Sequence, residues 1–157
     1  MLGDLVITPE GIGALVLGSP VSSDAASIAE YDPAYCGDGG DDYAGAWKST
    51  DPAEPFLIDS TDDFTKGGKL TAISVYTAGV TTDQGIAVGA TEDEFTAAHP
   101  EAVKSTGPFE IYSIPGNAGT LYAEFESGKL VAMVAESLDQ GPLDGALYAT
   151  DAYHPCA

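Results

Sequence analysis

The second half of the chain alternates apolar and polar residues in a pattern that predicts one helix followed by three strands. Thr91 and Glu94 have the spacing of a capping box, with Thr91 as N-cap and Glu94 as residue N3, so a helix is expected from there to His99–Pro100. The acidic residues of that first turn also suit the helix dipole. Turn-forming residues then separate three predicted strands, at 109–114, 120–126 and 129–135.

The first half of the chain is less regular. A short helix is expected at 24–31, where Ala25, Ile28 and Ala29 fall at helical spacing. Trp47, the single tryptophan, is expected to be the large anchor of the core in this half. Strands are predicted at 43–49, 56–58 and 69–76, and 5–7 reads as an edge strand or an anchoring tail. In the strand at 69–76, Ile73 and Val75 are expected to face the core.

Two stretches of the chain resemble each other. Residues 8–21 and 82–95 both begin Thr-x-x-Gly-Ile and continue to an apolar residue before a glycine and a helix-start signal. Residues 68–75 and 128–135 both read Gly-Lys-Leu followed by a strand pattern. This similarity predicts a divergent internal duplication.

The duplication leads to a definite expectation for the fold. We expect an α+β protein of two tandem helix-plus-antiparallel-sheet repeats, the first at residues 1–79 and the second at 80–157, which could also form one continuous domain. The second repeat would end in an irregular tail from Glu136 onward, rich in Gly, Pro and Asp.

The motif Gly89, Thr91, Glu94, Phe95, followed by a helix and a meander of strands, resembles a known repeat. It is similar to the tandem repeat of the β-lactamase inhibitor proteins and of SmpA/OmlA-type lipoproteins, and to uncharacterised secreted proteins and lipoproteins of actinobacteria. The resemblance implies a curved sheet with helices on its other side. Ala90 stands where those repeats have Met, and residues 18–21 keep the Gly but lose the Met and the Thr.

The charge of the chain excludes several partners. Its 157 residues include 25 acidic and 5 basic residues, for a formal net charge of −20, and all the basic residues are lysines. Such a chain repels nucleic acids and anionic membranes and attracts cationic partners or divalent cations. The alternative is that the acidity only keeps a secreted or salt-adapted protein soluble. No apolar run reaches the length of about 18 residues that spans a membrane, so membrane insertion is not expected.

The two cysteines, Cys36 and Cys156, are far apart and form no Cys-x-x-Cys motif. We expect them to form a disulfide, which would stabilise the fold by about 4–5 kcal/mol in the chain-entropy model. Together with the composition, this predicts an extracellular or cell-surface-attached protein whose signal peptide has been removed. The alternative is a cytosolic protein with two unpaired thiols.

Three places in the sequence are candidates for metal binding or catalysis. Asp38, Asp41 and Asp42 lie on a glycine-rich loop and could supply oxygen ligands to Ca²⁺, although their spacing is not that of an EF-hand; the alternative is a solvated acidic turn. His99, at a helix end, is expected to interact with the helix dipole. His154 could pair with Cys156 as a nucleophilic site only if no disulfide formed.

Tyrosines supply the candidate binding surface, formed by Tyr76, Tyr112 and Tyr122. Alternation places Tyr112 opposite in sense to Phe109 and Ile111, so Tyr112 is expected to be exposed. The alternative is that the tyrosines complete the core, with their hydroxyls at its rim.

These observations together predict a protein-binding module without catalytic activity. It would be secreted or attached to the cell envelope, would need no cofactor although it could bind Ca²⁺, and would bind an unknown extracellular protein in an inhibitor-like manner. The common hydrolase, zinc-protease and P-loop motifs do not occur in the sequence. The alternative function is a calcium-binding or structural component of the envelope.

The disulfide can be tested by titrating free thiols in the unfolded, non-reduced protein. We expect no reactive thiol, because Cys36 and Cys156 should be joined. The same titration after reduction is the control and should detect both cysteines. Two thiols before reduction would contradict both the disulfide and the extracytoplasmic location.

Overall fold

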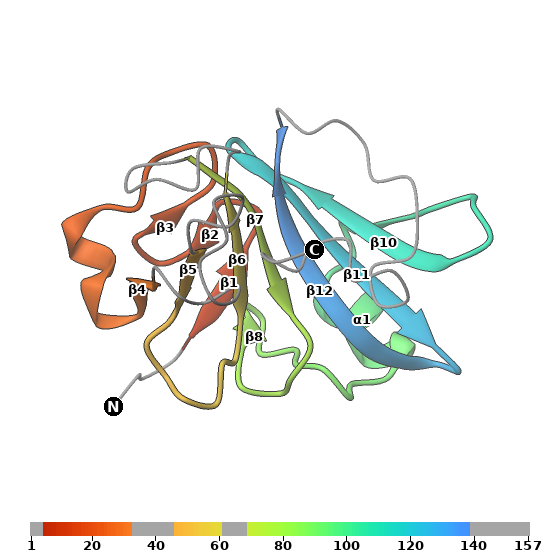
Figure 1. Ribbon diagram of the computed structural model, residues 1–157. Coiled ribbons are helices and arrows are strands. Elements are labelled where there is room, and N and C mark those ends of the chain that lie inside the picture. Colours follow the sequence, from red (N-terminus) through yellow and green to blue (C-terminus); the bar gives the residue numbers. More distant parts are fainter. Residues whose placement is uncertain (1–4, 33–45, 61–68, 139–157) are drawn as a thin grey trace.

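The computed structural model describes residues 5–32, 46–60 and 69–138. In these residues the fold is mostly β, with a four-stranded sheet, an eight-stranded sheet and one short α-helix (Figure 1). No helix among them is long and apolar enough to cross a membrane.

The eight-stranded sheet is antiparallel throughout and has the order β4-β5-β6-β7-β12-β11-β10-β9. Each half of it is a meander of consecutive strands, and the two meanders meet where β7 pairs with β12. The strands are β4 (Ala29–Asp32), β5 (Ala46–Ser49), β6 (Leu57–Ser60), β7 (Leu70–Val75), β9 (Val103–Lys104), β10 (Glu110–Pro115), β11 (Gly119–Glu126) and β12 (Lys129–Ser137).

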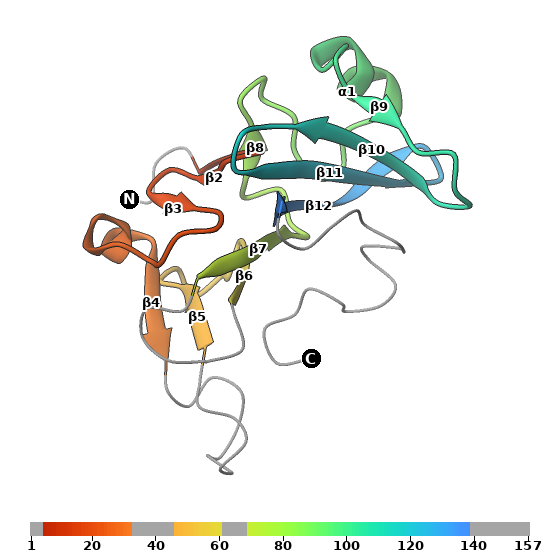
Figure 2. The same cartoon turned by 90° about the horizontal axis from the view of Figure 1, so that it is seen from above.

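The four-stranded sheet has the order β3-β2-β1-β8 and is mixed, because β1 and β8 run parallel. Its strands are β1 (Val6–Thr8), β2 (Gly11–Ile12), β3 (Leu15–Val16) and β8 (Thr81–Thr82). The small sheet and helix α1 (Glu92–Ala98) lie on the same side of the large sheet, which we call its inner face (Figure 2).

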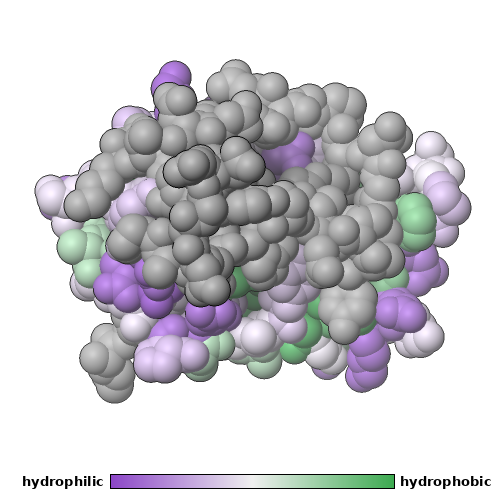
Figure 3. Space-filling model, in the orientation of Figure 1, coloured by the Kyte–Doolittle hydropathy of each residue, from purple (hydrophilic) through white to green (hydrophobic). Residues whose placement is uncertain are grey.

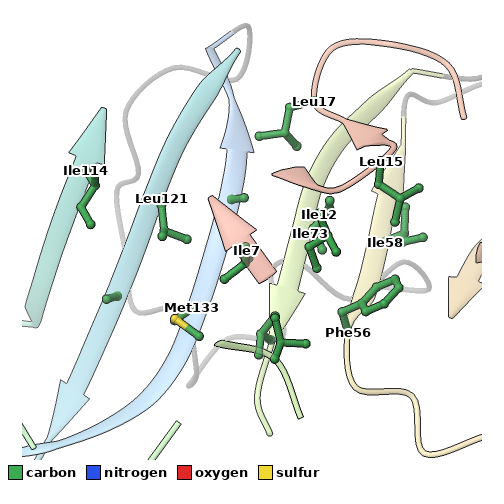
Figure 4. Close-up of a cluster of buried hydrophobic side chains, with 14 of the residues drawn as sticks. Ile7, Ile12, Leu15, Leu17, Phe56, Ile58, Ile73, Ile114, Leu121 and Met133 are labelled. Carbon is green, nitrogen blue, oxygen red and sulfur yellow. The ribbon is translucent and has the colours of Figure 1, made fainter. Parts of the chain in front are cut away.

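The main core lies between the two sheets. Directly opposed residues of an antiparallel sheet share one face, and the register places Ile114, Leu121, Ala135, Ile73 and Ile58 in one row across the inner face. Apolar residues of the small sheet pack onto this row, including Ile7, Ile12 and Leu15, all fully buried (Figure 4). The alternation of the strands therefore selects the residues of the core.

The expected fold of two tandem helix-plus-sheet repeats is wrong. The described residues contain one α-helix, and the strands expected to form two small sheets belong to one continuous sheet, with a second, mixed sheet packed on it. The helix expected at 24–31 is a 3-10 helix, η1 (Ser23–Ser27), followed directly by β4. A helix this short is marginal by itself, and here pairing of β4 with β5 prevails, with the Tyr31 and Trp47 rings 5.7 Å apart in an edge-to-face contact.

Several local predictions are confirmed. Helix α1 has Thr91 as its N-cap, with both hydrogen bonds of the capping box to Glu94. Strands β7, β11 and β12 lie where they were expected, although β12 continues through Ser137 into the segment predicted to be an irregular tail. Trp47 packs at the margin of the core, whereas Phe56 is fully buried and is the larger contributor to the core of this half.

The two similar Thr-x-x-Gly-Ile stretches come together in the small sheet. Val6 pairs with Thr81 and Ile7 with Thr82, so the strand that opens the first stretch lies beside the strand that opens the second. Each stretch also has a threonine hydroxyl that accepts a hydrogen bond from a backbone N–H further along the turn. Thr8 accepts from Glu10, and Thr82 accepts from Ile86.

The turn between β10 and β11 packs closely against the turn between β1 and β2. The Glu10 carboxylate accepts hydrogen bonds from the backbone N–H groups of Asn117 and Ala118, at 2.7 and 2.8 Å. Gly119 also lies at this contact, because a Cβ there would be 2.9 Å from the carbonyl oxygen of Pro9 and 2.5 Å from Leu17 Cδ1, and even closer to the carbonyl oxygen of Glu136. The contact joins the small sheet to the large one.

Substituting Gly119→Ala should therefore destabilise the fold. We expect a loss of about 1–3 kcal/mol, the usual cost of overpacking, measured as a lower urea midpoint with an unchanged m-value. Gly107→Ala is the matched control, since its Cβ would meet only the Ser105 hydroxyl at 3.4 Å. Equal stability of the two variants would show that Gly119 is not packed this closely against Pro9, Leu17 and Glu136.

Candidate functional site

Helix α1 and the residues packed around it form a group of aromatic and titratable side chains. Phe95, fully buried, lies at its centre, with ring centroids 5.1 Å from His99, 5.4 Å from Tyr112 and 5.3 Å from Phe125. Two polar networks flank this aromatic cluster, one at each end of the helix.

The first network consists of Thr82, His99 and Glu101. His99 Nε2 lies 2.7 Å from Thr82 Oγ1, and His99 Nδ1 lies 3.2 Å from Glu101 Oε1. This geometry suits the tautomer with its proton on Nδ1. In it, the Nδ1–H group donates a hydrogen bond to the carboxylate, and Nε2 accepts a hydrogen bond from the Thr82 hydroxyl. The pKa of Glu101 is lowered, chiefly by a hydrogen bond from its own backbone N–H, with a contribution from His99.

A hydroxyl, an imidazole and a carboxylate in this order are the parts of a nucleophilic triad. Here, however, the Thr82 side chain is buried, with 1% of the residue exposed, and its oxygen also accepts the Ile86 backbone N–H at 3.2 Å. A substrate carbonyl would have to displace these contacts to reach the oxygen. The geometry therefore suits a structural role, in which the triad fastens β8 and the following turn to the end of α1.

The second network consists of Glu92, Lys104 and Tyr112. The Tyr112 hydroxyl donates to Glu92 Oε1 at 2.6 Å, and Lys104 Nζ lies 2.9 Å from the same oxygen and 5.5 Å from the centre of the Tyr112 ring. The network ties the first turn of α1 to the outermost strands of the large sheet, β9 and β10.

These contacts shift the pKa values of all three groups. The Tyr112 hydroxyl and then Lys104 hold the pKa of the Glu92 carboxyl below its usual value. The hydrogen bond to Glu92 raises the pKa of Tyr112, because a phenolate would face a carboxylate, and it also raises the pKa of Lys104. At neutral pH the network is therefore a charge-assisted hydrogen bond together with an ion pair.

The structure divides the three tyrosines of the predicted binding surface between the two faces of the large sheet. Tyr112 is on the inner face and is 8% exposed, so the expectation that it is exposed is wrong. The alternation was correct, but Ile111 does not face the main core: it faces a second, smaller apolar cluster on the outer face. Tyr76 and Tyr122 are partly buried and pack against that second cluster.

The outer face also contains a row of residues that runs inward from the edge strand. The register opposes Val103 to Ser113, Ser113 to Tyr122, and Tyr122 to Val134. Exposure falls along the row, from 62% at Val103 to 0% at Val134. Tyr122 thus lies between an exposed edge and a buried centre.

The other predicted site residues lie outside the described residues. These are the candidate calcium ligands Asp38, Asp41 and Asp42, the cysteines Cys36 and Cys156, and His154. Within the part of the chain that the structure describes, no group of three or more His, Cys, Asp or Glu side chains could hold a metal ion.

Sequence reasoning missed the partners of His99 and the exposure of Val103 and Phe109. The Thr82 contact spans 17 residues, and no local pattern indicates it, although Thr82 opens the stretch that resembles residues 8–21. Comparison of the chain with protein-family models, with curated proteins and with solved structures finds no match.

The Glu92–Tyr112 hydrogen bond predicts a pH-dependent effect of Tyr112→Phe. The lowered pKa of Glu92 means that its stabilisation is present above the unfolded-state pKa and is lost as the pH falls through the folded-state pKa. The raised pKa of Tyr112 means that its stabilisation is present below the unfolded-state pKa and is lost as the pH rises through the folded-state pKa. The free energy of unfolding of the variant should be about 1 kcal/mol lower than that of the wild type at neutral pH. This difference should shrink below about pH 4.5 and above about pH 10.

The free energy of unfolding of both proteins, measured by urea denaturation across this pH range, tests the prediction. In a Glu92→Gln background, Tyr112→Phe should have a smaller effect that no longer shrinks at acid pH. A loss that stays the same at every pH would show that the hydroxyl does not act through the Glu92 carboxylate.

Proposed function

We propose that this chain is a secreted or cell-envelope module that acts by binding another protein and has no catalytic activity. The observation that carries the proposal is the exposure of Val103 (62%) and Phe109 (43%) on the β9–β10 hairpin. They are two of the four large apolar residues that the described part of the chain leaves exposed. Val103 lies in β9, the edge strand of the large sheet, and Phe109 lies in the loop between β9 and β10.

Single exposed apolar residues are normal on a protein surface, but two on one protruding element make that element a candidate contact site. The β9–β10 hairpin extends beyond the rest of the sheet (Figure 1). On that side of the molecule, apolar surface lies among hydrophilic residues (Figure 3). A partner that covered these side chains would gain roughly 25 cal/mol for each Å² of apolar surface removed from water.

The register also supports a contact site here. Because Val103, Ser113 and Tyr122 follow one another across the outer face, a partner seated on the hairpin would meet Tyr122 next. Tyr122 belongs to the binding surface predicted from the sequence, so this part of the prediction coincides with the exposed apolar edge.

The extracytoplasmic location and the inhibitor-like role have other support. The location is supported by the composition, which is rich in Gly, Ser, Thr and Asp, and by the two cysteines, Cys36 and Cys156, which are expected to form a disulfide. The inhibitor-like role follows from the resemblance of the Gly89–Phe95 motif to the β-lactamase inhibitor proteins. Both remain parts of the proposal.

Binding can be tested by comparing three proteins as bait in culture medium and envelope extract of the source cells. The proteins are the wild type, a Val103→Thr/Phe109→Thr double variant, and a Val16→Thr control that changes another exposed valine, in β3. We expect the wild type and the control to retain the same protein and the double variant to lose it. The absence of any retained protein that depends on the hairpin would overturn the proposal, provided that thermal unfolding shows the variants to be folded.

A further inference from the structure

The centre of the outer face of the large sheet is buried. The register places Ile111 of β10 and Glu124 of β11 beside Ala132 of β12 on this face. It places Tyr122 beside Val134 in the next row. Ala132 and Val134 are fully buried, and Ile111 is 7% exposed. Side chains on a sheet face that water reaches retain exposed surface, so a second layer covers this centre.

Two glutamates on the same face are buried as well. Glu124 is 7% exposed, and Glu136, which the register opposes to Ala72 in β7, is 4% exposed. A glutamate on an open sheet face extends into water, because burying its charge costs free energy. Neither carboxylate is without a partner. The layer over the outer face therefore keeps water from charged side chains as well as from apolar ones.

The described part of the chain does not supply this layer. The small sheet and helix α1 lie on the inner face (Figure 2). The apolar residues that meet on the outer face all lie in the large sheet or directly after β7: Ala72, Ile111, Ala132, Val134, Tyr76 and Tyr122. We call the first four of them the outer cluster. They are buried within a single chain, so the layer comes from residues outside 5–32, 46–60 and 69–138.

Two of the remaining segments are loops, whose length limits their reach. Residues 61–68 join β6 to β7, and residues 33–45 join β4 to β5, both at the end of the sheet opposite to Ile111. At about 3.4 Å per residue, the middle of these loops extends roughly 15 Å and 24 Å from the strand ends. Ile111 lies three strands beyond β7 and five beyond β5. At about 4.8 Å per strand, it is roughly 24 Å and 28 Å from the two attachments, so neither loop reaches it.

The segment that follows β12 has the required reach. Residues 139–157 are joined to the described part of the chain at one end only, and their 19 residues span up to about 65 Å when extended. They start from a strand that itself belongs to the buried face. The segment carries large apolar side chains at Leu143, Leu147, Tyr148 and Tyr153. Residues 1–4, by contrast, precede a residue that packs against the main core on the inner face.

We propose that residues 139–157 fold back over the outer face and cover the outer cluster. Apolar side chains of the segment pack on Val134 and Ala132, and its hydroxyl and backbone N–H groups donate to the buried glutamates. The large sheet is then the middle of three layers, between the small sheet and this segment. The inference is independent of the proposed function, because Val103 and Phe109 do not belong to the outer cluster.

Nuclear Overhauser contacts in the full chain test this arrangement directly. We expect contacts from the methyl groups of Val134 and Ile111 to side chains of residues 139–157. The methyl groups of Ile7 and Leu121, in the main core, are the internal control and should show no such contact. Contacts of the outer-face methyl groups with residues 33–45 or 61–68 in place of 139–157, or with none of these segments, would overturn the inference.

A double variant, Leu143→Ser/Leu147→Ser, should loosen the layer. We expect the methyl resonances of Val134 to shift and to relax several-fold faster with a soluble paramagnetic probe, whereas those of Leu121 should not change. Leu138→Ser is the matched control, because Leu138 is 57% exposed and directly precedes the segment. Equal protection of Val134 in the folded double variant and in the control would contradict the proposal. If the double variant does not fold, the wild-type contacts decide.

Discussion

The pairing of β7 with β12 is the contact on which the rest of the structure depends. It joins a meander from the first half of the chain to a meander from the second, through Val75–Met133 and the three pairs beyond it. The pairing makes the inner face continuous, so that the row from Ile114 to Ile58 can cross from one half to the other. Without it, each half would offer four strands and too small an apolar face for the small sheet to cover.

Sequence patterns were informative wherever a local rule decides the outcome. The capping box of Thr91 and Glu94 marks the start of α1, and the two positive φ angles at Ser127 and Gly128 explain why these residues make the tight turn between β11 and β12. The helix expected at 24–31 failed because tertiary pairing of β4 prevails over a short helical pattern. The join between β7 and β12 could not be read from the sequence either, since the similar strand patterns at 68–75 and 128–135 give no information on which strands become neighbours.

In the candidate site, too, local patterns could be predicted from the sequence and tertiary contacts could not. Alternation along β10 correctly separated Tyr112 from Ile111, but it could not tell which side faces the main core, because apolar clusters lie on both faces of this sheet. The networks around α1 depend on contacts between residues 17 and 20 positions apart, which no motif encodes. The exposed hairpin is visible only once the order of the strands places β9 at an edge.

The contact of Glu10 with Asn117 and Ala118 has a consequence for the order in which the chain can fold. Asn117 and Ala118 lie 107 and 108 residues after Glu10 in the sequence. The parallel pairing of β1 with β8 spans a large part of the chain as well. During synthesis, the N-terminal strands therefore emerge long before the surfaces that stabilise them. Contacts of such high sequence separation slow folding, because the loop must close before they form. The small sheet should accordingly be among the last parts of the molecule to become stable, although three of its strands, β1 to β3, are made before the strands of the large sheet.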